Sequence, residues 1–301
     1  MKDKLTTSFL ILIFFAGLSL LLYPTVSQYW NSLHQSRVIT DYTEHISQMD
    51  QEEYEKIREE AHLYNERLRK NYYEVDLEDY FSQLDPAGNG TMGYVEIPCI
   101  NTILPIVHST EDSVLSESVG HVEWSSLPVG GESTHTVLSG HRGLPTAELL
   151  TNIDHMVLGD VFTLYVLGEE LQYMVDQILV VEPKDSSALQ IVSGKDYCTL
   201  LTCTPYGINS HRLLVRGIRL GSDADGVFPF SIANEAKEVS PLHLAGGALL
   251  VLTTFTFLLL ALGIHISLKQ RKARLQRRAK YRRKKRLERL KQEQNEGEYH
   301  E

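Results

Sequence analysis

The chain has 301 residues, 43% of hydrophobic types, and a formal net charge of −10, which excludes a wholly disordered protein. Residues 8–26 and 242–268 contain no Asp, Glu, Lys or Arg, and each run is close to the roughly 20 residues with which a helix crosses a bilayer. This excludes a fully soluble cytosolic protein. Residues 27–241 hold 13 Lys and Arg against 33 Asp and Glu. That excess of negative charge repels phosphate backbones and argues against a nucleic-acid role.

The first apolar run follows a short basic start at residues 1–7, which contains Lys2 and Lys4. A cleaved signal peptide would have the same basic start and apolar core. The run is long, however, and it continues into YPTVSQYW rather than into a clear small-x-small cleavage site. We therefore predict a cytoplasmic N-terminus over residues 1–7 and a retained transmembrane helix over residues 8–26.

The second apolar run, residues 242–268, is followed at once by a tail, residues 269–301, with 14 Lys and Arg against 5 Glu. Because loops rich in Lys and Arg stay in the cytoplasm, we predict a two-pass protein of the cell membrane. Both termini would be cytoplasmic and residues 27–241 extracellular. A nucleic-acid-binding arm would be equally basic, but a basic tail next to a span is more typical of a stop-transfer segment that binds membrane lipids.

Residues 27–83 contain neither Gly nor Pro and mix Glu with regularly spaced apolar residues. This pattern predicts helices, which we interpret mostly as a solvated stalk that includes a lid region. Turn-forming residues at 85–90 mark the change to a second kind of segment. We expect a catalytic domain over residues 84–222 and a linker over residues 223–241 before the second span.

The segment 84–222 contains short β-rich runs that alternate with turns. Many short strands at roughly even spacing are typical of an all-β barrel or sandwich. We therefore predict a mainly β fold for this domain. The runs are residues 93–97, 136–138, 161–166, 172–175, 178–181, 197–202 and 213–215.

The chain has three cysteines, and in a domain that faces an oxidising exterior an odd number leaves at least one free thiol. Cys203 ends the strand-like run 197–202 and precedes a turn, which suits a nucleophile above a cleft. Cys198 lies five residues earlier, an odd offset that points its side chain to the opposite face, so we predict a buried core residue. Cys99 has no evident chemistry, and a Cys198–Cys203 disulfide along one strand is geometrically poor.

A thiol with a pKa near 8.5 is only a few per cent ionised at neutral pH and needs a base or cation nearby. His141 follows a β-like run between glycines, and Arg212 lies nine residues after Cys203 on the next β-like run. The residues alone indicate a Cys/His/Arg site and leave structural roles open for His141. The histidines with the same ambiguity are His108, His121, His135 and His211. No metal-binding motif is present, and we expect no cofactor.

Several motifs together resemble class C, pilus-type sortases. The most specific is TLLTCTPYG at 199–207, followed by HRLLVRG at 211–217. The segment MGYVEIP at 92–98 resembles their first barrel strand. The segments LPVGG at 127–131, STH at 133–135 and SGHRGLP at 139–145 resemble the block around their catalytic histidine.

The resemblance implies a closed sortase-type β-barrel, preceded by a helical segment and flanked by two transmembrane helices. It implies a cysteine transpeptidase in which Cys203 attacks the Thr–Gly bond of an LPxTG-like sorting signal and forms a thioacyl enzyme. His141 would act as acid and then as base, and Arg212 would stabilise the oxyanion or hold the substrate. Thr202 and Thr204 would line the substrate site.

The implied partners are pilin or surface proteins with an LPxTG-like signal, joined to a pilin lysine. Two alternatives stay open, namely a sortase that attaches proteins to cell-wall precursor and a catalytically inactive membrane-anchored scaffold. One departure from the family pattern is evident, because residues 66–82 lack the Asp-Pro-aromatic lid motif. Tyr72, Tyr73 and Asp76 could form a substitute, so we predict a weak or unconventional lid.

Overall fold

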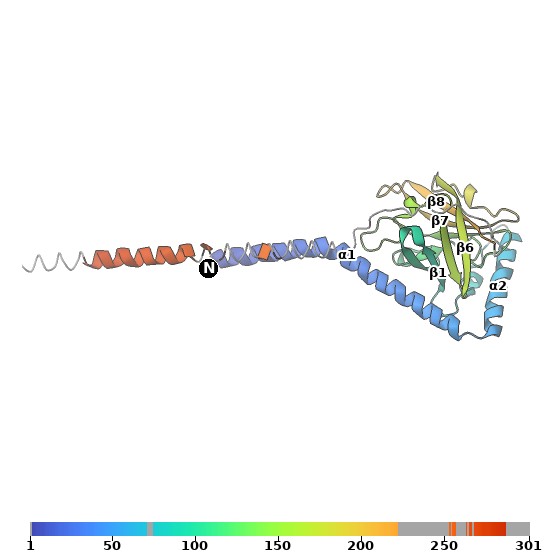
Figure 1. Cartoon of the computed structure of the whole chain (residues 1–301), viewed down its shortest axis with the longest axis horizontal. Coiled ribbons are helices and arrows are strands. Elements are labelled where there is room, and N and C mark those ends of the chain that lie inside the picture. The colour runs from blue at the N-terminus through green and yellow to red at the C-terminus, as the bar shows by residue number, and fades with distance from the viewer. Residues whose placement is uncertain are drawn as a thin grey trace, which may run out of the picture. The chain divides into compact units, whose positions relative to one another are not determined.

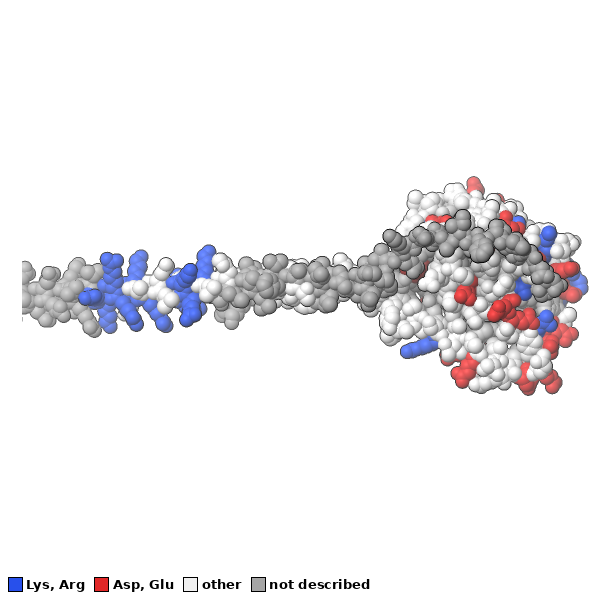
Figure 2. Space-filling model, in the orientation of Figure 1, with Lys and Arg blue, Asp and Glu red and all other residues white. Residues whose placement is uncertain are grey.

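The computed structural model describes residues 2–70, 75–221, 253, 255–256, 263, 265–266 and 268–286. The chain divides into two compact units, Met1–Glu235 and Ala236–Glu301. The first unit contains the helices and the β-barrel drawn in blue to yellow in Figure 1. In the second unit, residues 268–286 are helical and all of them are exposed. They include the basic residues coloured blue in Figure 2.

Helix α1 (Lys2–Gln48) contains the whole first apolar run and continues through Pro24 without a break. Its segment Thr7–Gln48 is long and apolar enough to cross a membrane, with a mean hydropathy of 2.3 in its most apolar window. A long apolar N-terminal helix of this kind suggests membrane anchoring. The predicted linker 223–241 lies outside the described residues, and so does most of the predicted second span.

Helices α2 (Gln51–Lys70) and α3 (Leu77–Ser82) follow α1 and confirm the predicted helical segment. They do not form a solvated stalk, however. Ala61, Tyr64, Leu68 and Tyr80 are all buried and belong to the same hydrophobic cluster as the barrel interior. Apolar side chains at helical spacing on one face of α2 explain this packing. The polar overall composition of residues 27–83 had favoured a solvated helix instead.

Eight strands close into a barrel, so the predicted mainly β fold is confirmed. Their order around the barrel is β1-β2-β3-β4-β7-β8-β6-β5. The strands are β1 (Thr91–Ile97), β2 (Thr102–His108), β3 (Val119–His121), β4 (Thr134–Ser139), β5 (Val161–Val166), β6 (Glu169–Val181), β7 (Asp196–Thr204) and β8 (His211–Arg219). Short helices between them are η1 (Pro98–Ile100), α4 (Asp112–Leu115), η2 (Ile153–His155) and η3 (Ser187–Leu189).

Two pairings in this barrel are parallel, β2 with β3 and β4 with β7, and the others are antiparallel. Strand β6 merges two of the predicted runs into one strand with an irregularity between Val175 and Gln177. The carboxylate of the intervening Asp176 accepts two hydrogen bonds from Arg216 on β8, at 2.9 and 2.8 Å. The two neighbouring strands are therefore also joined by a bidentate ion pair.

Side chains of α1 and α2 bond directly to the backbone of the barrel. The buried Tyr42 hydroxyl donates to the carbonyl of Met92 at 3.0 Å and accepts from the Leu167 N–H at 2.8 Å. Asn65 is also buried, and its amide donates to the Leu127 carbonyl at 3.2 Å and accepts from the Leu127 N–H at 2.7 Å. Because buried backbone groups need partners, these two side chains fix the helices in place.

We predict that Asn65→Ala lowers the free energy of unfolding by about 1–3 kcal/mol, because it leaves the buried N–H of Leu127 without its partner. Thermal or denaturant unfolding of the full-length chain in detergent measures this change. Glu66→Ala is the control on the next residue. It removes only an exposed ion pair with Lys70, so its cost is at most about 1 kcal/mol. Equal effects of the two variants would contradict the assignment.

Candidate active site

The site lies where β7 and β8 approach their connecting turn. Cys203 on β7 is directly opposite Arg212 on β8 in the antiparallel register. Directly paired residues point to the same face, with Cβ atoms about 4.5–5.5 Å apart. Both side chains are partly exposed. The hairpin thus brings sulfur and guanidinium to one edge.

His141 reaches the same edge from the end of β4. This strand runs parallel to β7 with Ser139 paired to Leu201, so His141 and Cys203 each lie two residues beyond that pair. Parallel strands present equivalent ends on the same side of a sheet. Two backbone hydrogen bonds hold the loop there. The Gly140 N–H donates to the Leu201 carbonyl at 3.0 Å, and the His141 carbonyl accepts from the Leu150 N–H at 3.2 Å.

The guanidinium of Arg212 donates through Nη1 to two carbonyls of its own hairpin, those of Asn209 at 3.4 Å and His211 at 3.2 Å. Within the described part of the chain, no carboxylate lies within ion-pair distance of it. The hairpin carbonyls therefore orient the side chain, and among the described residues its positive charge has no carboxylate partner.

The two threonines that flank Cys203 differ in environment. Thr202 is 1% exposed, and its hydroxyl donates to the Gly140 carbonyl at 2.8 Å. Thr204 is partly exposed, and its hydroxyl accepts from Arg142 at 3.3 Å. Substrate binding by Thr202 and Thr204 stays a prediction. What the contacts establish is that both hydroxyls connect β7 to the loop that carries His141.

Sequence reasoning singled out neither of two further side chains beside His141. Asp112 on α4 places its Oδ1 atom 3.9 Å from Nε2 of His141, a distance that allows charge attraction when the imidazole is protonated. Asp112 is fully exposed, and solvent weakens such a pair. Arg142 is adjacent to His141 in the chain, but its contacts involve residues up to 62 positions away.

The remaining barrel histidines are bonded within the structure. His121 is fully buried between Tyr80 and the Ser126 carbonyl, and burial lowers its pKa to about 4. Burial likewise lowers the pKa of His108 and His135. These imidazoles are therefore neutral at pH 7. Among the described residues, no group of three or more His, Cys, Asp or Glu side chains is arranged to hold a metal ion.

The other two cysteines are placed unlike Cys203. Cys198 is 0% exposed and packs in the barrel core, as its odd offset predicts, and burial raises the pKa of its thiol. Cys99 is half-buried, and burial together with the neighbouring Asp160 carboxylate raises the pKa of its thiol to about 12. Of the three thiols, Cys203 alone combines partial exposure with an adjacent Arg and His.

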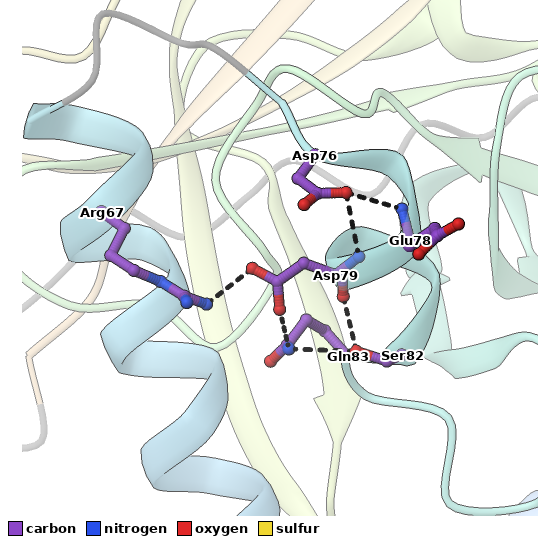
Figure 3. A network of polar contacts seen from close by, with 6 residues as sticks. All are labelled: Arg67, Asp76, Glu78, Asp79, Ser82 and Gln83. Carbon is purple, nitrogen blue, oxygen red and sulfur yellow. Dashed lines mark hydrogen bonds and ion pairs between the residues drawn. The ribbon is translucent and has the colours of Figure 1, made fainter.

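The acidic residue considered for a substitute lid is used as a helix cap. Asp76 precedes α3, and its carboxylate accepts from the N–H groups of Glu78 and Asp79 (Figure 3). Asp79 in turn pairs with Arg67 on α2 at 2.7 Å and accepts from Gln83 at 3.0 Å. This network ties α3 to α2. Tyr72 and Tyr73 lie outside the described residues.

A model of the sortase domain matches residues 95–219. Sortase D of Bacillus subtilis (strain 168) is 30% identical over 138 residues, which cover 45% of this chain and 67% of that protein. The chain belongs to the sortase family. Members of this family are cysteine transpeptidases, so this sortase is an enzyme of that type.

Solved structures narrow the class. Sortase C1 from Streptococcus agalactiae is 49% identical, with a TM-score of 0.60, over 62% of this chain and all of that chain. Sortase C from Streptococcus pneumoniae is 46% identical, with a TM-score of 0.54, over 62% of this chain and 97% of that chain. Clostridium perfringens sortase C with the C-terminal cell wall sorting motif is 45% identical, with a TM-score of 0.56, over 62% of this chain and 99% of that chain. These likenesses confirm the class C resemblance.

We predict that a methanethiosulfonate reagent at pH 8 modifies Cys203 first in the full-length sortase. Cys198 should react only on unfolding, and Cys99 slowly, because a pKa of about 12 leaves about one thiol in 10⁴ ionised. Mass spectrometry of timed samples gives the order, and Cys203→Ala should remove the fast phase.

The same experiment tests for a lid over Cys203. We expect a labelling rate within about tenfold of that of a free thiol peptide, because a lid without a stiffening proline loses about 1–2 kcal/mol of ordering entropy per residue when it closes. Deleting residues 27–83 is unsuitable as a comparison, since four of their side chains complete the barrel core. A rate more than 100-fold below that of the peptide would show that an effective lid covers the thiol.

Proposed function

We propose that this sortase joins pilin subunits through a thioacyl intermediate on Cys203, with His141 as acid and base and Arg212 as the oxyanion-binding cation. The observation that carries the proposal is the direct β7–β8 pairing of Cys203 with Arg212, beside the end of β4 that bears His141. A nucleophile, a titratable base and a fixed cation at one edge are the components that acyl transfer requires.

In the first half-reaction, the Cys203 thiolate attacks the threonine carbonyl of the Thr–Gly bond in a sorting signal. A carbon–sulfur bond forms, and negative charge develops on the carbonyl oxygen, opposite the Arg212 guanidinium. When the carbon–nitrogen bond breaks, protonated His141 gives its proton to the leaving glycine amine. The products are a thioester on Cys203 and a free amine.

In the second half-reaction, neutral His141 accepts a proton from an incoming lysine ammonium group. The resulting amine attacks the thioester and gives a second oxyanion beside Arg212. The attacking nitrogen releases its extra proton to water, and collapse of the intermediate breaks the carbon–sulfur bond and expels the Cys203 thiolate. An isopeptide bond forms, and no energy source is needed because one acyl bond replaces another. Thr204, which is partly exposed, is proposed to border the substrate strand next to Cys203, whereas the Thr202 side chain is too deeply buried to do so.

The choice of substrate rests on the relatives. The C. perfringens enzyme was solved with its C-terminal cell wall sorting motif, and the S. pneumoniae work concerns pilin substrate specificity. We carry over to this chain an LPxTG-like signal and a pilin lysine as acceptor. The two-pass topology, with the acidic barrel outside and the basic tail on anionic cytoplasmic lipids, belongs to the same proposal. It is supported by the opposite charges of the two segments.

A sorting-signal peptide tests the proposal directly. We predict that the full-length enzyme in detergent forms a thioacyl adduct that mass spectrometry locates at Cys203, and that Cys203→Ala abolishes both adduct and product. Cys198→Ala is the matched control. It should lower stability by removing buried atoms from the core and still form the adduct. Adduct loss in Cys198→Ala alone would overturn the assignment of the nucleophile.

We also predict that Arg212→Lys lowers kcat by about 10²–10³-fold, the usual cost of removing a donor to the oxyanion. The charge is kept, but an ammonium lacks the planar fork of a guanidinium. Arg216→Lys, four residues further along β8, is the control and should keep kcat. Steady-state kinetics with the same peptide and amine measures both. Near wild-type turnover of Arg212→Lys would exclude the oxyanion role.

A further inference from the structure

Both chain neighbours of His141 are bonded to the two chain neighbours of Cys203. The carbonyl of Gly140 accepts from the Thr202 hydroxyl at 2.8 Å, and Nη1 of Arg142 donates to the Thr204 hydroxyl at 3.3 Å. The β4–β7 ladder extends only as far as the Gly140 N–H, which donates to Leu201. Beyond that point, these two side-chain bonds join the loop that carries His141 to the end of β7 that carries Cys203.

The guanidinium of Arg142 is held from three further directions. Its Nε donates to the Thr151 carbonyl at 3.1 Å, and its Nη2 donates to the Asp154 carboxylate at 2.5 Å. The ring of Tyr206, in the turn after Cys203, lies 6.0 Å from the guanidinium carbon. The side chain of Arg142 is only 9% exposed. A charge so far removed from water requires partners of this quality.

The residue after Arg142 completes the same junction. Gly143 has a φ of +79°, and a Cβ atom there would lie 2.9 Å from the Tyr206 ring. Its N–H donates to the Thr151 hydroxyl at 3.1 Å. The backbone after His141 therefore packs directly against the turn after Cys203, and no side chain fits between them.

We propose that Arg142 is a positioning residue for the acyl-transfer reaction. It joins the loop that carries His141 to Thr204 and so sets the distance from the imidazole to the Cys203 thiol. Three N–H groups of one planar fork reach acceptors on two segments, which an ammonium or a neutral amide cannot copy. The inference rests on the proposed roles of His141 and Cys203, and it adds a residue that does not touch the substrate.

The test is the full-length enzyme in detergent, with sorting-signal peptide and amine, for Arg142→Gln and Arg142→Lys. We expect kcat to fall about 10–100-fold, as for a misplacement of about 1 Å, with KM changed less than about threefold. The rate of alkylation of Cys203 at pH 7 is the second readout. A thiol is activated by a base or cation at a fixed position beside it, so a displaced His141 should lower this rate.

Thr204→Val and its combination with Arg142→Gln measure the bond between the two loops. If Arg142 acts through Thr204, the double variant should lose no more activity than the more impaired single variant, whereas independent effects would multiply. Asp154→Asn keeps the shape of the anchor and should have a smaller effect in the same direction. This series stays informative if Arg142→Gln itself folds poorly.

Arg216→Gln is the matched control, because it breaks a bidentate pair with Asp176 at 19% and 24% exposure. It should lower the melting temperature and leave kcat and the alkylation rate of Cys203 unchanged. An equal loss of kcat in Arg216→Gln, a rise in KM alone in Arg142→Gln, or an unchanged alkylation rate in Arg142→Gln would overturn the positioning role. Failure of the proposed function is distinct, since Cys203→Ala would then keep its activity.

Discussion

The position of β7 between a parallel neighbour and an antiparallel neighbour is the constraint on which the site depends. The antiparallel partner, β8, places Arg212 opposite Cys203. The parallel partner, β4, ends at the same edge and delivers the loop with His141. Parallel strands need a crossover connection, so His141 comes from a distant part of the chain and meets the β7–β8 hairpin only when the barrel closes.

The two faces of β7 have separate tasks. Cys198 and Leu200 point into the barrel and are 0% exposed, whereas Cys203 lies on the opposite face and is partly exposed. Because side chains alternate along a strand, one nine-residue strand supplies both core packing and the proposed nucleophile. The burial that keeps Cys198 unreactive also fixes the backbone from which Cys203 projects.

The N-terminal helices pack against the closed barrel and extend its hydrophobic core. Tyr42 and Asn65 bond to barrel backbone, and Ala61, Tyr64 and Leu68 fill its core. This region therefore contributes to the stability of the catalytic domain. It differs from a detachable cover, and its polar contacts include the Arg67–Asp79 ion pair, which holds α2 to α3.

Local sequence features predicted a large part of the fold and supplied the residues of the candidate site. The apolar run at residues 8–26, the helices before residue 84 and most strands follow from periodicity within a few residues. Likewise, the odd offset between Cys198 and Cys203 assigns them to opposite faces. Strands β2 and β3 were not predicted, because β2 contains Pro105, which is unusual within a strand, and β3 has three residues.

Only the tertiary structure determines the contacts between segments that lie far apart in the chain. The sequence motif predicted His141, Cys203 and Arg212 as site residues. Nothing local indicates that Asp112 lies beside His141 or that Arg142 bonds to Thr204, 62 residues away. The helical pattern of residues 51–70 is compatible with a solvated stalk and with a buried face. Periodicity reports which side of an element is apolar, whereas the partner of that side is set by the closure of the barrel.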